Sequence, residues 1–124
     1  MRPDDFRRLA LALEGAFEGA HMGHPDFRVN GRIFATLHAD ERFGMVKLTP
    51  EQQGGFVAEH PETFTSENGA WGRQGCTRVQ LKSVHEEVLG EALTLTWQNA
   101  VHTRSAKRST RKRAGSQARQ SGKR

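Results

Sequence analysis

FRVNGRIFATL, residues 27–37, carries the strongest structural signal in this chain. It contains two partly apolar runs on either side of Asn30-Gly31, and this dipeptide tolerates the positive φ angles that both central positions of a type I′ turn require. The stretch therefore predicts a β-hairpin with strands at residues 27–29 and 32–37.

The two-residue turn also predicts the register of the hairpin. It places Phe27 opposite Phe34 and Val29 opposite Arg32. Because side chains alternate along a strand, it turns the other apolar residues of the second strand toward the opposite face of the sheet: Ile33, Ala35 and Leu37. Both faces of this strand are therefore expected to be partly apolar.

Helical signals lie on both sides of the hairpin. Apolar residues recur at i, i+3, i+4 and i+7 between Phe6 and Leu13, which predicts an amphipathic helix near the N-terminus. A third strand is expected at residues 43–48. Thr49-Pro50-Glu51-Gln52 then predicts the start of a second helix, because its first and last residues form a capping box and proline suits the first turn. His60-Pro61 ends this helix.

The second half of the chain supplies one more strand and one more helix. Residues 66–75 are rich in glycine and are expected to form turns. Residues 77–82 alternate between polar and apolar, which predicts a strand. Ser83 and Glu86 suggest a second capping box before a helix whose apolar stripe runs to Trp97. The order αβββα(β)βα predicts an α+β domain, with helices packed on a small antiparallel sheet.

Charge divides the chain at residue 103. Nine of the 19 Lys and Arg lie in residues 103–124, a segment without acidic residues. This segment therefore carries +9, whereas residues 1–102, with ten bases and all 14 acids, carry −4. The largest apolar side chain in residues 103–124 is alanine, so this segment cannot bury enough surface to offset the entropy of ordering. We expect a domain at residues 1–102 and a basic, disordered tail at 103–124, whose first residues could extend the preceding helix.

Nothing in the composition indicates export or a membrane. The longest apolar run is the five residues from Leu9 to Leu13, far short of the ~18 that a membrane span needs. The N-terminus is acidic where a signal peptide is basic and then apolar. Cys76 is the only cysteine and cannot form an internal disulfide. These features predict a cytoplasmic protein with no membrane partner.

Four blocks of sequence resemble the MmcQ/YjbR-like family. They are HPDFRV at 24–29, GRIFATL at 31–37, MVKLTPEQ at 45–52 and GAWGRQGCT at 69–77. The resemblance covers roughly residues 1–102. It implies a small cytoplasmic α+β domain with a double-wing arrangement, a shape that suggests DNA binding, and it brings no catalytic residues. The basic tail departs from the family's compact pattern.

The basic segment itself suggests a polyanion partner, most often a nucleic acid. Its candidate contacts are Arg104, Lys107, Arg108, Arg111, Lys112 and Arg113. A second set lies on the expected strands and loops, where a winged domain contacts backbone phosphate: Arg28, Arg32, Lys47, Arg73, Arg78 and Lys82. The alternatives are a solubilising tail and a scattered solvent face whose cations pair with Asp26, Glu67 or Glu86.

Few other residues suggest a site. Trp71, beside Arg73, could stack on a base, although a tryptophan in a small domain more often packs into the core. Cys76 is expected to begin a strand, away from a helix N-terminus, which favours inert packing over nucleophilic chemistry. His21 and His24 supply only two of the three or four ligands that a stable metal site needs. We expect no catalytic residues, no metal and no cofactor.

These observations predict a non-enzymatic DNA-binding protein. Its contacts would be mainly to the phosphate backbone, from the basic tail and the wing loops, and would carry no base readout. RNA is the alternative polyanion. The alternative function is a protein-binding or small-ligand-binding module with a solubilising tail.

Overall fold

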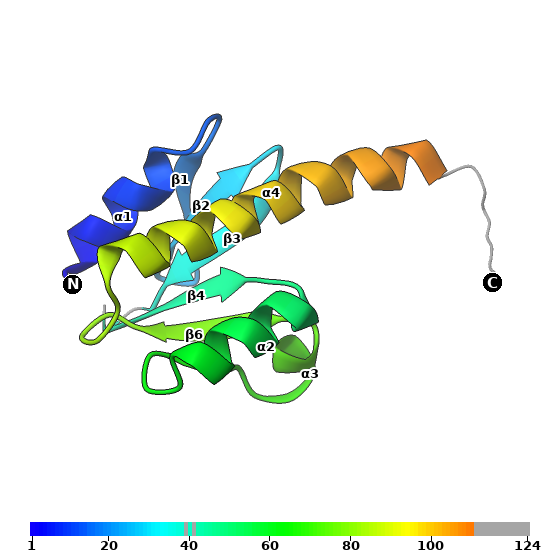
Figure 1. Cartoon of the computed structure of the whole chain (residues 1–124). Coiled ribbons are helices and arrows are strands. Elements are labelled where there is room, and N and C mark those ends of the chain that lie inside the picture. Colours follow the sequence, from blue (N-terminus) through cyan, green and yellow to red (C-terminus); the bar gives the residue numbers. More distant parts are fainter. Residues whose placement is uncertain (39, 41, 111–124) are drawn as a thin grey trace.

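The computed structural model of the chain describes residues 1–38, 40 and 42–110, and the side chains up to residue 102. Within these residues the order of elements is α1 (Pro3–Leu11), β1 (Phe17–His21), β2 (His24–Val29), β3 (Arg32–Leu37), β4 (Phe43–Lys47), α2 (Pro50–Glu59), β5 (Phe64–Ser66), α3 (Gly69–Arg73), β6 (Cys76–Gln80) and α4 (Glu86–Thr110). Figure 1 shows α4 crossing the sheet, with its last turns extending past the strands. The predicted α+β class is confirmed.

The strands form one antiparallel sheet in the order β1-β2-β3-β4-β6-β5. Its two halves, β1-β2-β3 and β4-β6-β5, are joined by pairs at only three positions, from Ala35↔Val46 to Leu37↔Gly44. This is the double-wing arrangement that the resemblance implied. Strand β1 was not predicted, because Phe17-Glu18-Gly19-Ala20-His21 lacks the alternation of a half-buried strand.

The long helices cover one face of the sheet. Helix α4 contacts β2, β3 and β4, α1 packs on α4, and α2 lies against β5. The ring of Phe6 in α1 lies 5.8 Å from that of Phe27, and a Cβ on Gly44 would lie 2.5 Å from the Phe6 ring. Residues 45 and 47 alternate with the buried Gly44 and Val46, so they face the other side of the sheet.

The central hairpin forms with a bulge that the sequence did not reveal. Asn30 and Gly31 have φ angles of 54° and 76°, as a type I′ turn requires, and Val29 pairs with Arg32. The predicted pairing of Phe27 with Phe34 is wrong, because Phe27 pairs with Ala35.

The bulge changes which side chains reach the core. Phe27 pairs with Ala35, and the next residue of β2, Arg28, pairs with Ile33. Phe34 therefore has no partner on β2 and is the extra residue of the bulge. Phe34 and Ala35 are both fully buried. Ile33 instead lines a pocket together with Thr36 and Met45. The expectation that Ile33 shares a face with Ala35 is therefore wrong.

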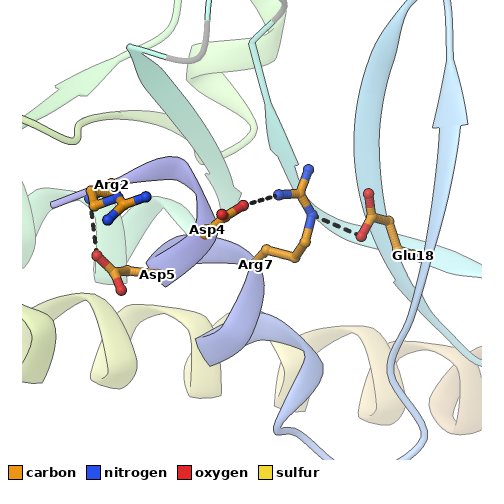
Figure 2. Close-up of polar contacts among 5 residues, drawn as sticks. All are labelled: Arg2, Asp4, Asp5, Arg7 and Glu18. Atoms are coloured by element: carbon orange, nitrogen blue, oxygen red, sulfur yellow. Dashed lines mark hydrogen bonds and ion pairs between the residues drawn. The ribbon is translucent and has the colours of Figure 1, made fainter.

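Polar contacts fix the start of α1 and attach it to the edge strand (Figure 2). The backbone amide of Arg2 donates to Asp5 Oδ2 at 3.1 Å, and this bond holds the pKa of the Asp5 carboxyl below its usual range. Arg7 donates to Asp4 at 2.7 Å and to Glu18 of β1 at 2.9 Å. These exposed bonds orient α1, but each contributes little to stability.

One of the two expected capping boxes forms. The Thr49 hydroxyl accepts from the backbone amide of Gln52 at 3.1 Å, and the backbone amide of Thr49 donates to the side-chain oxygen Oε1 of Gln52 at 3.0 Å. The prediction of a capping box at Ser83 is wrong. Helix α4 begins only at Glu86, and the Ser83 hydroxyl lies 2.9 Å from that of Thr63. The segment expected to contain only turns contains the last residue of β5 and all of α3.

Helix α4 continues to Thr110, so the first eight residues beyond the expected boundary at 102 are helical. Residues 111–124, including the candidate contacts Arg111, Lys112 and Arg113, lie outside the described residues. None of the helices described here combines the length and apolar character needed to cross a membrane.

Candidate nucleic-acid interface

A cleft opens where β3 and β4 separate beyond their three paired positions. We call it the basic cleft, and it holds about 560 Å³. It is lined by His21, Arg28, Gly31, Arg32, Ile33, Phe34, Lys47, Leu48, Thr49, Pro50, Gln74, Thr96, Asn99 and Ala100. Three of the predicted cations therefore converge from three neighbouring strands, and none of the described residues that line the cleft is acidic.

Arg32 is positioned by the turn of the central hairpin. It pairs with Val29 immediately after Asn30-Gly31, so the local turn sequence fixes its backbone. Its Nε is buried and has no hydrogen-bond partner among the described residues. The Nε of Arg78, which lies away from the cleft, is buried and unpartnered in the same way. Leaving such a donor unsatisfied costs about 1–3 kcal/mol, which an anionic oxygen would recover only after the Arg32 side chain turns its Nε toward the cleft.

Arg28 is held by a buried carboxylate. Asp26 has no solvent exposure, and its two oxygens accept from Arg28 Nε at 2.7 Å and Arg28 Nη2 at 3.0 Å. His21 Nδ1 lies 2.7 Å from Asp26 Oδ2. Hydrogen bonds from Arg28, and then from His21, hold the pKa of the Asp26 carboxyl below its usual range. Asp26 thus orients Arg28 and offsets part of its charge.

Gly19 makes room for this pair. It lies opposite Asp26 on the neighbouring strand β1. A Cβ at this position would lie 2.9 Å from Asp26 Oδ1 and 3.0 Å from Arg28 Nε. The edge strand that sequence patterns missed therefore helps to bury the carboxylate.

A side-chain amide fixes the wall of the cleft formed by α4. Asn99 Nδ2 donates to the Lys47 carbonyl at 3.3 Å and to Gln52 Oε1 at 2.9 Å. These bonds tie α4 to the end of β4 and the first turn of α2. Beyond Ala100 the helix carries Arg104, Lys107 and Arg108, whose backbone is described and whose side chains are not.

The other three predicted wing cations lie elsewhere. Arg78 donates to Glu67 at 3.2 Å and lies over the Phe43 ring at 5.4 Å, so it forms one of the surface pairs weighed as an alternative. Lys82 lies just after Gln80, the last residue of β6, which pairs with Phe43. Lys47 pairs with Cys76 at the first residue of β6, so Lys82 and Lys47 lie at opposite ends of this strand. Arg73 is exposed at the end of α3.

A second hollow lies on the face of the sheet away from α4. We call it the sheet-face pocket, and it holds about 440 Å³. It is lined by His21, His24, Ile33, Thr36, His38, Met45, Lys47, Glu67, Asn68, Trp71 and Cys76. His21, Ile33 and Lys47 line both hollows, so the pocket and the basic cleft adjoin.

Trp71 lies at this pocket, and the expectation that it packs into the core is wrong. It is 64% exposed on α3. The core is instead built around four fully buried phenylalanines, Phe6, Phe27, Phe34 and Phe64. Helix α3 contacts β6, outside the layer of long helices, so its tryptophan stays in solvent.

The structure places the other candidate groups as follows. Cys76 begins β6 and is 5% exposed, so the expectation that it is packed is confirmed, and burial raises the pKa of its thiol. The ring centroids of His24 lie 5.9 Å from His21 and 6.4 Å from His38. In the described part of the chain, no group of three or more His, Cys, Asp or Glu could hold a metal ion.

Sequence reasoning named Asp26 as a surface partner for the cations, and Arg28 does pair with it, but the burial of Asp26 was not predicted. Asp26 and Arg28 are two apart on one strand, so their side chains share a face. Asn99 has no comparable signal, because its partners lie 52 and 47 residues away.

Comparisons with known proteins agree with this fold. A family model described as YjbR matches residues 11–99. The crystal structure of the Deinococcus radiodurans protein DR2400, described as a DUF419 domain, is similar with a TM-score of 0.65 and 22% sequence identity. The similarity covers 76% of this chain and 74% of that chain. None of the curated proteins compared with the chain matches it.

Proposed function

The chain belongs to the YjbR family, and we propose that it is a non-enzymatic DNA-binding protein that contacts phosphates in its basic cleft and along the basic segment that follows. The observation that carries this proposal is the convergence of Arg28, Arg32 and Lys47 in one cleft without an acidic lining residue among those described. The unpartnered Nε of Arg32 supports it, because a change of side-chain rotamer that exposes this donor to the cleft would let a phosphate oxygen satisfy it.

The distribution of charge supports a local rather than a general attraction. Residues 1–102 carry −4, so the domain as a whole repels a polyanion. A cleft lined by one sign of charge focuses the field and raises the local concentration of the opposite charge. The basic cleft and the basic segment meet on α4, since Arg104 lies four residues, about one helical turn, beyond Ala100. One phosphate backbone could therefore contact both.

The test is fluorescence anisotropy with a labelled DNA duplex over roughly 50 to 300 mM salt, because the slope of affinity against salt counts phosphate contacts. The full chain is compared with Arg32→Ala/Lys47→Ala and with a chain that ends at Thr110. Losing two contacts should reduce the slope by about 1.8, at 0.9 for each contact. Lys82→Ala is the matched control, because Lys82 is not among the described residues that line the cleft and lies at the end of β6 away from Lys47.

The outcomes separate the two elements. A reduced slope for the double variant, with an unchanged slope for Lys82→Ala, supports the cleft. A loss confined to the chain that ends at Thr110 would assign binding to residues 111–124 of the basic segment. If the full chain binds neither the duplex nor a single strand of the same length, DNA binding is wrong and the alternative of a protein-binding or small-ligand-binding module remains. A labelled RNA duplex of the same length tests the other polyanion.

A further inference from the structure

Trp71 is presented to solvent on a backbone held in place by its neighbours. It is 64% exposed, yet the next residue, Gly72, is buried, and a Cβ there would lie 1.8 Å from the Glu67 carbonyl oxygen. The Gln53 side-chain amide of α2 donates to the Gly72 carbonyl at 3.1 Å. These contacts hold α3 against its neighbours. An aromatic ring on a rigid element loses little entropy when a ligand stacks on it.

The pocket beside this ring suits a flat, partly apolar group. Ile33, Met45 and Cys76 contribute apolar surface, and His24 and Asn68 contribute polar groups. A volume of about 440 Å³ lies within the range of roughly 300–1,000 Å³ typical of small-ligand sites. A nucleobase has this combination of a π-face for stacking and a polar edge for hydrogen bonds.

The pocket adjoins the cleft in which we place phosphates. Lys47, Ile33 and His21 line both, so a ligand could place a ring in the pocket and its phosphates beside Lys47 and Arg32. In a duplex the faces of the bases are stacked on one another. A base can enter such a pocket only after it has left the stack, which costs a few kcal/mol in a duplex and least in a single strand.

We propose that the sheet-face pocket holds one unpaired base of a DNA strand, stacked on Trp71, while the adjoining phosphates lie in the basic cleft. The protein therefore prefers single-stranded DNA to duplex. This inference rests on the proposed function, because the phosphate contacts bring the strand to the pocket. Aromatic stacking beside a cationic groove tolerates any base, so it predicts no sequence preference.

The test uses the full chain and three labelled DNAs of equal length: a thymine single strand, the same strand with every base replaced by an abasic analogue, and a duplex. The abasic strand keeps the phosphates and removes the bases. Trp71→Ala should weaken binding to the thymine strand by about 5- to 150-fold, the range for one stacked base, and leave the other two unchanged. Phe17→Ala is the matched control, because Phe17 is 51% exposed on β1 and is not among the described residues lining either hollow.

Fluorescence gives a second measurement that does not remove the ring. The chain has two tryptophans, so in a Trp97→Phe background Trp71 is the sole reporter. The thymine strand should quench its emission, and the abasic strand should not.

Each result decides the inference. Equal binding of the thymine and abasic strands, or unchanged affinity and emission when Trp71 is probed, would overturn the base site and leave the phosphate contacts standing. If none of the three DNAs binds, the proposed function fails and the base site fails with it. The melting temperature of Trp71→Ala should match that of the unchanged chain, because the side chain is exposed.

Discussion

Replacing Asp26 by asparagine should lower stability and strengthen DNA binding at once. Asp26 accepts two hydrogen bonds from Arg28, at 2.7 and 3.0 Å, and lies 2.7 Å from His21 Nδ1. Asparagine has nearly the same shape, but it carries no charge and offers one acceptor oxygen in place of two. The substitution therefore weakens the support of Arg28 while it removes the anion that competes with phosphate.

The loss of stability follows from the burial of the carboxylate. Hydrogen bonds to a charged group contribute about 1.5–3 kcal/mol, and solvent screens part of this because Arg28 is 33% exposed and His21 44%. We expect the free energy of unfolding to fall by about 2 kcal/mol at neutral pH. The pKa of Asp26 is depressed below its ordinary 3.8, so its contribution is fully present above that pH. It is lost as the pH falls through the folded-state value, where the two proteins should converge.

The gain in binding follows from the charge of the cleft. Arg28 lies in the cleft with its charge partly offset by Asp26, so once it lacks this counter-ion its phosphate contact should become a full one and steepen the salt slope by up to about 0.9. Urea unfolding across the acid range and anisotropy against salt measure the two effects. Asp40→Asn is the matched control, since Asp40 also lies two residues before an arginine but is 50% exposed and outside both hollows.

Two results would refute this reasoning. If Asp26→Asn binds DNA more weakly with an unchanged salt slope, Arg28 does not contact phosphate. If the stability difference persists at acid pH, the charge of the carboxylate is not what Arg28 requires. Asp40→Asn should change neither quantity appreciably.

Three further substitutions test the packing that holds the cleft. Thr49→Ala removes the hydroxyl that caps α2 and should lower the free energy of unfolding by about 1 kcal/mol, measured in urea. Gly44→Ala places a methyl group 2.5 Å from the buried Phe6 ring and should cost about 1–3 kcal/mol in the same titration. Gln53→Ala removes one donor from each of the Gly72 and Cys76 carbonyls, which keep their backbone donors, and should cost about 0.5–1.5 kcal/mol. Its melting temperature should fall by about 4–8 °C per kcal/mol.

Matched variants make these results specific. Gly55→Ala lies in α2 with open space around its Cβ, so it should raise stability by about 0.5–1 kcal/mol, opposite in sign to Gly44→Ala. Gln74→Ala removes an exposed amide one residue beyond α3 and should have little effect. Equal effects at the two glycines, or at the two glutamines, would contradict the packing described. An unchanged urea midpoint for Thr49→Ala would contradict the cap.

Sequence patterns located the features that depend on neighbouring residues. The turn at Asn30-Gly31 requires two positive φ angles, and the cap at Thr49 requires a partner three residues away, so both can be found locally. The bulge at Phe34 buries two consecutive side chains, those of Phe34 and Ala35, and local alternation could not predict such a pattern. The Ser83 motif failed because its hydroxyl bonds to Thr63, 20 residues away.

In the candidate site, too, the residue types could be recognised in the sequence, whereas their arrangement depends on distant contacts. The cations themselves were visible in the sequence, but only Arg28, Arg32 and Lys47 meet, because β3 and β4 separate after three paired positions. That separation depends on the tertiary fold. Trp71 was visible too, yet its exposure depends on the attachment of α3 outside the layer of long helices.

The fold keeps the residues that build the core apart from those that we propose to bind DNA. Helices α1, α2 and α4 bury one face of the sheet, and Arg28, Arg32 and Lys47 are not part of that core. Binding and stability should therefore change independently at Arg32 and Lys47, and together at Arg28, whose partner is buried. The domain's charge of −4 opposes the approach of DNA, and added salt screens this repulsion as well as the phosphate contacts. A chain without the basic segment should consequently show a shallower salt slope than its number of phosphate contacts implies.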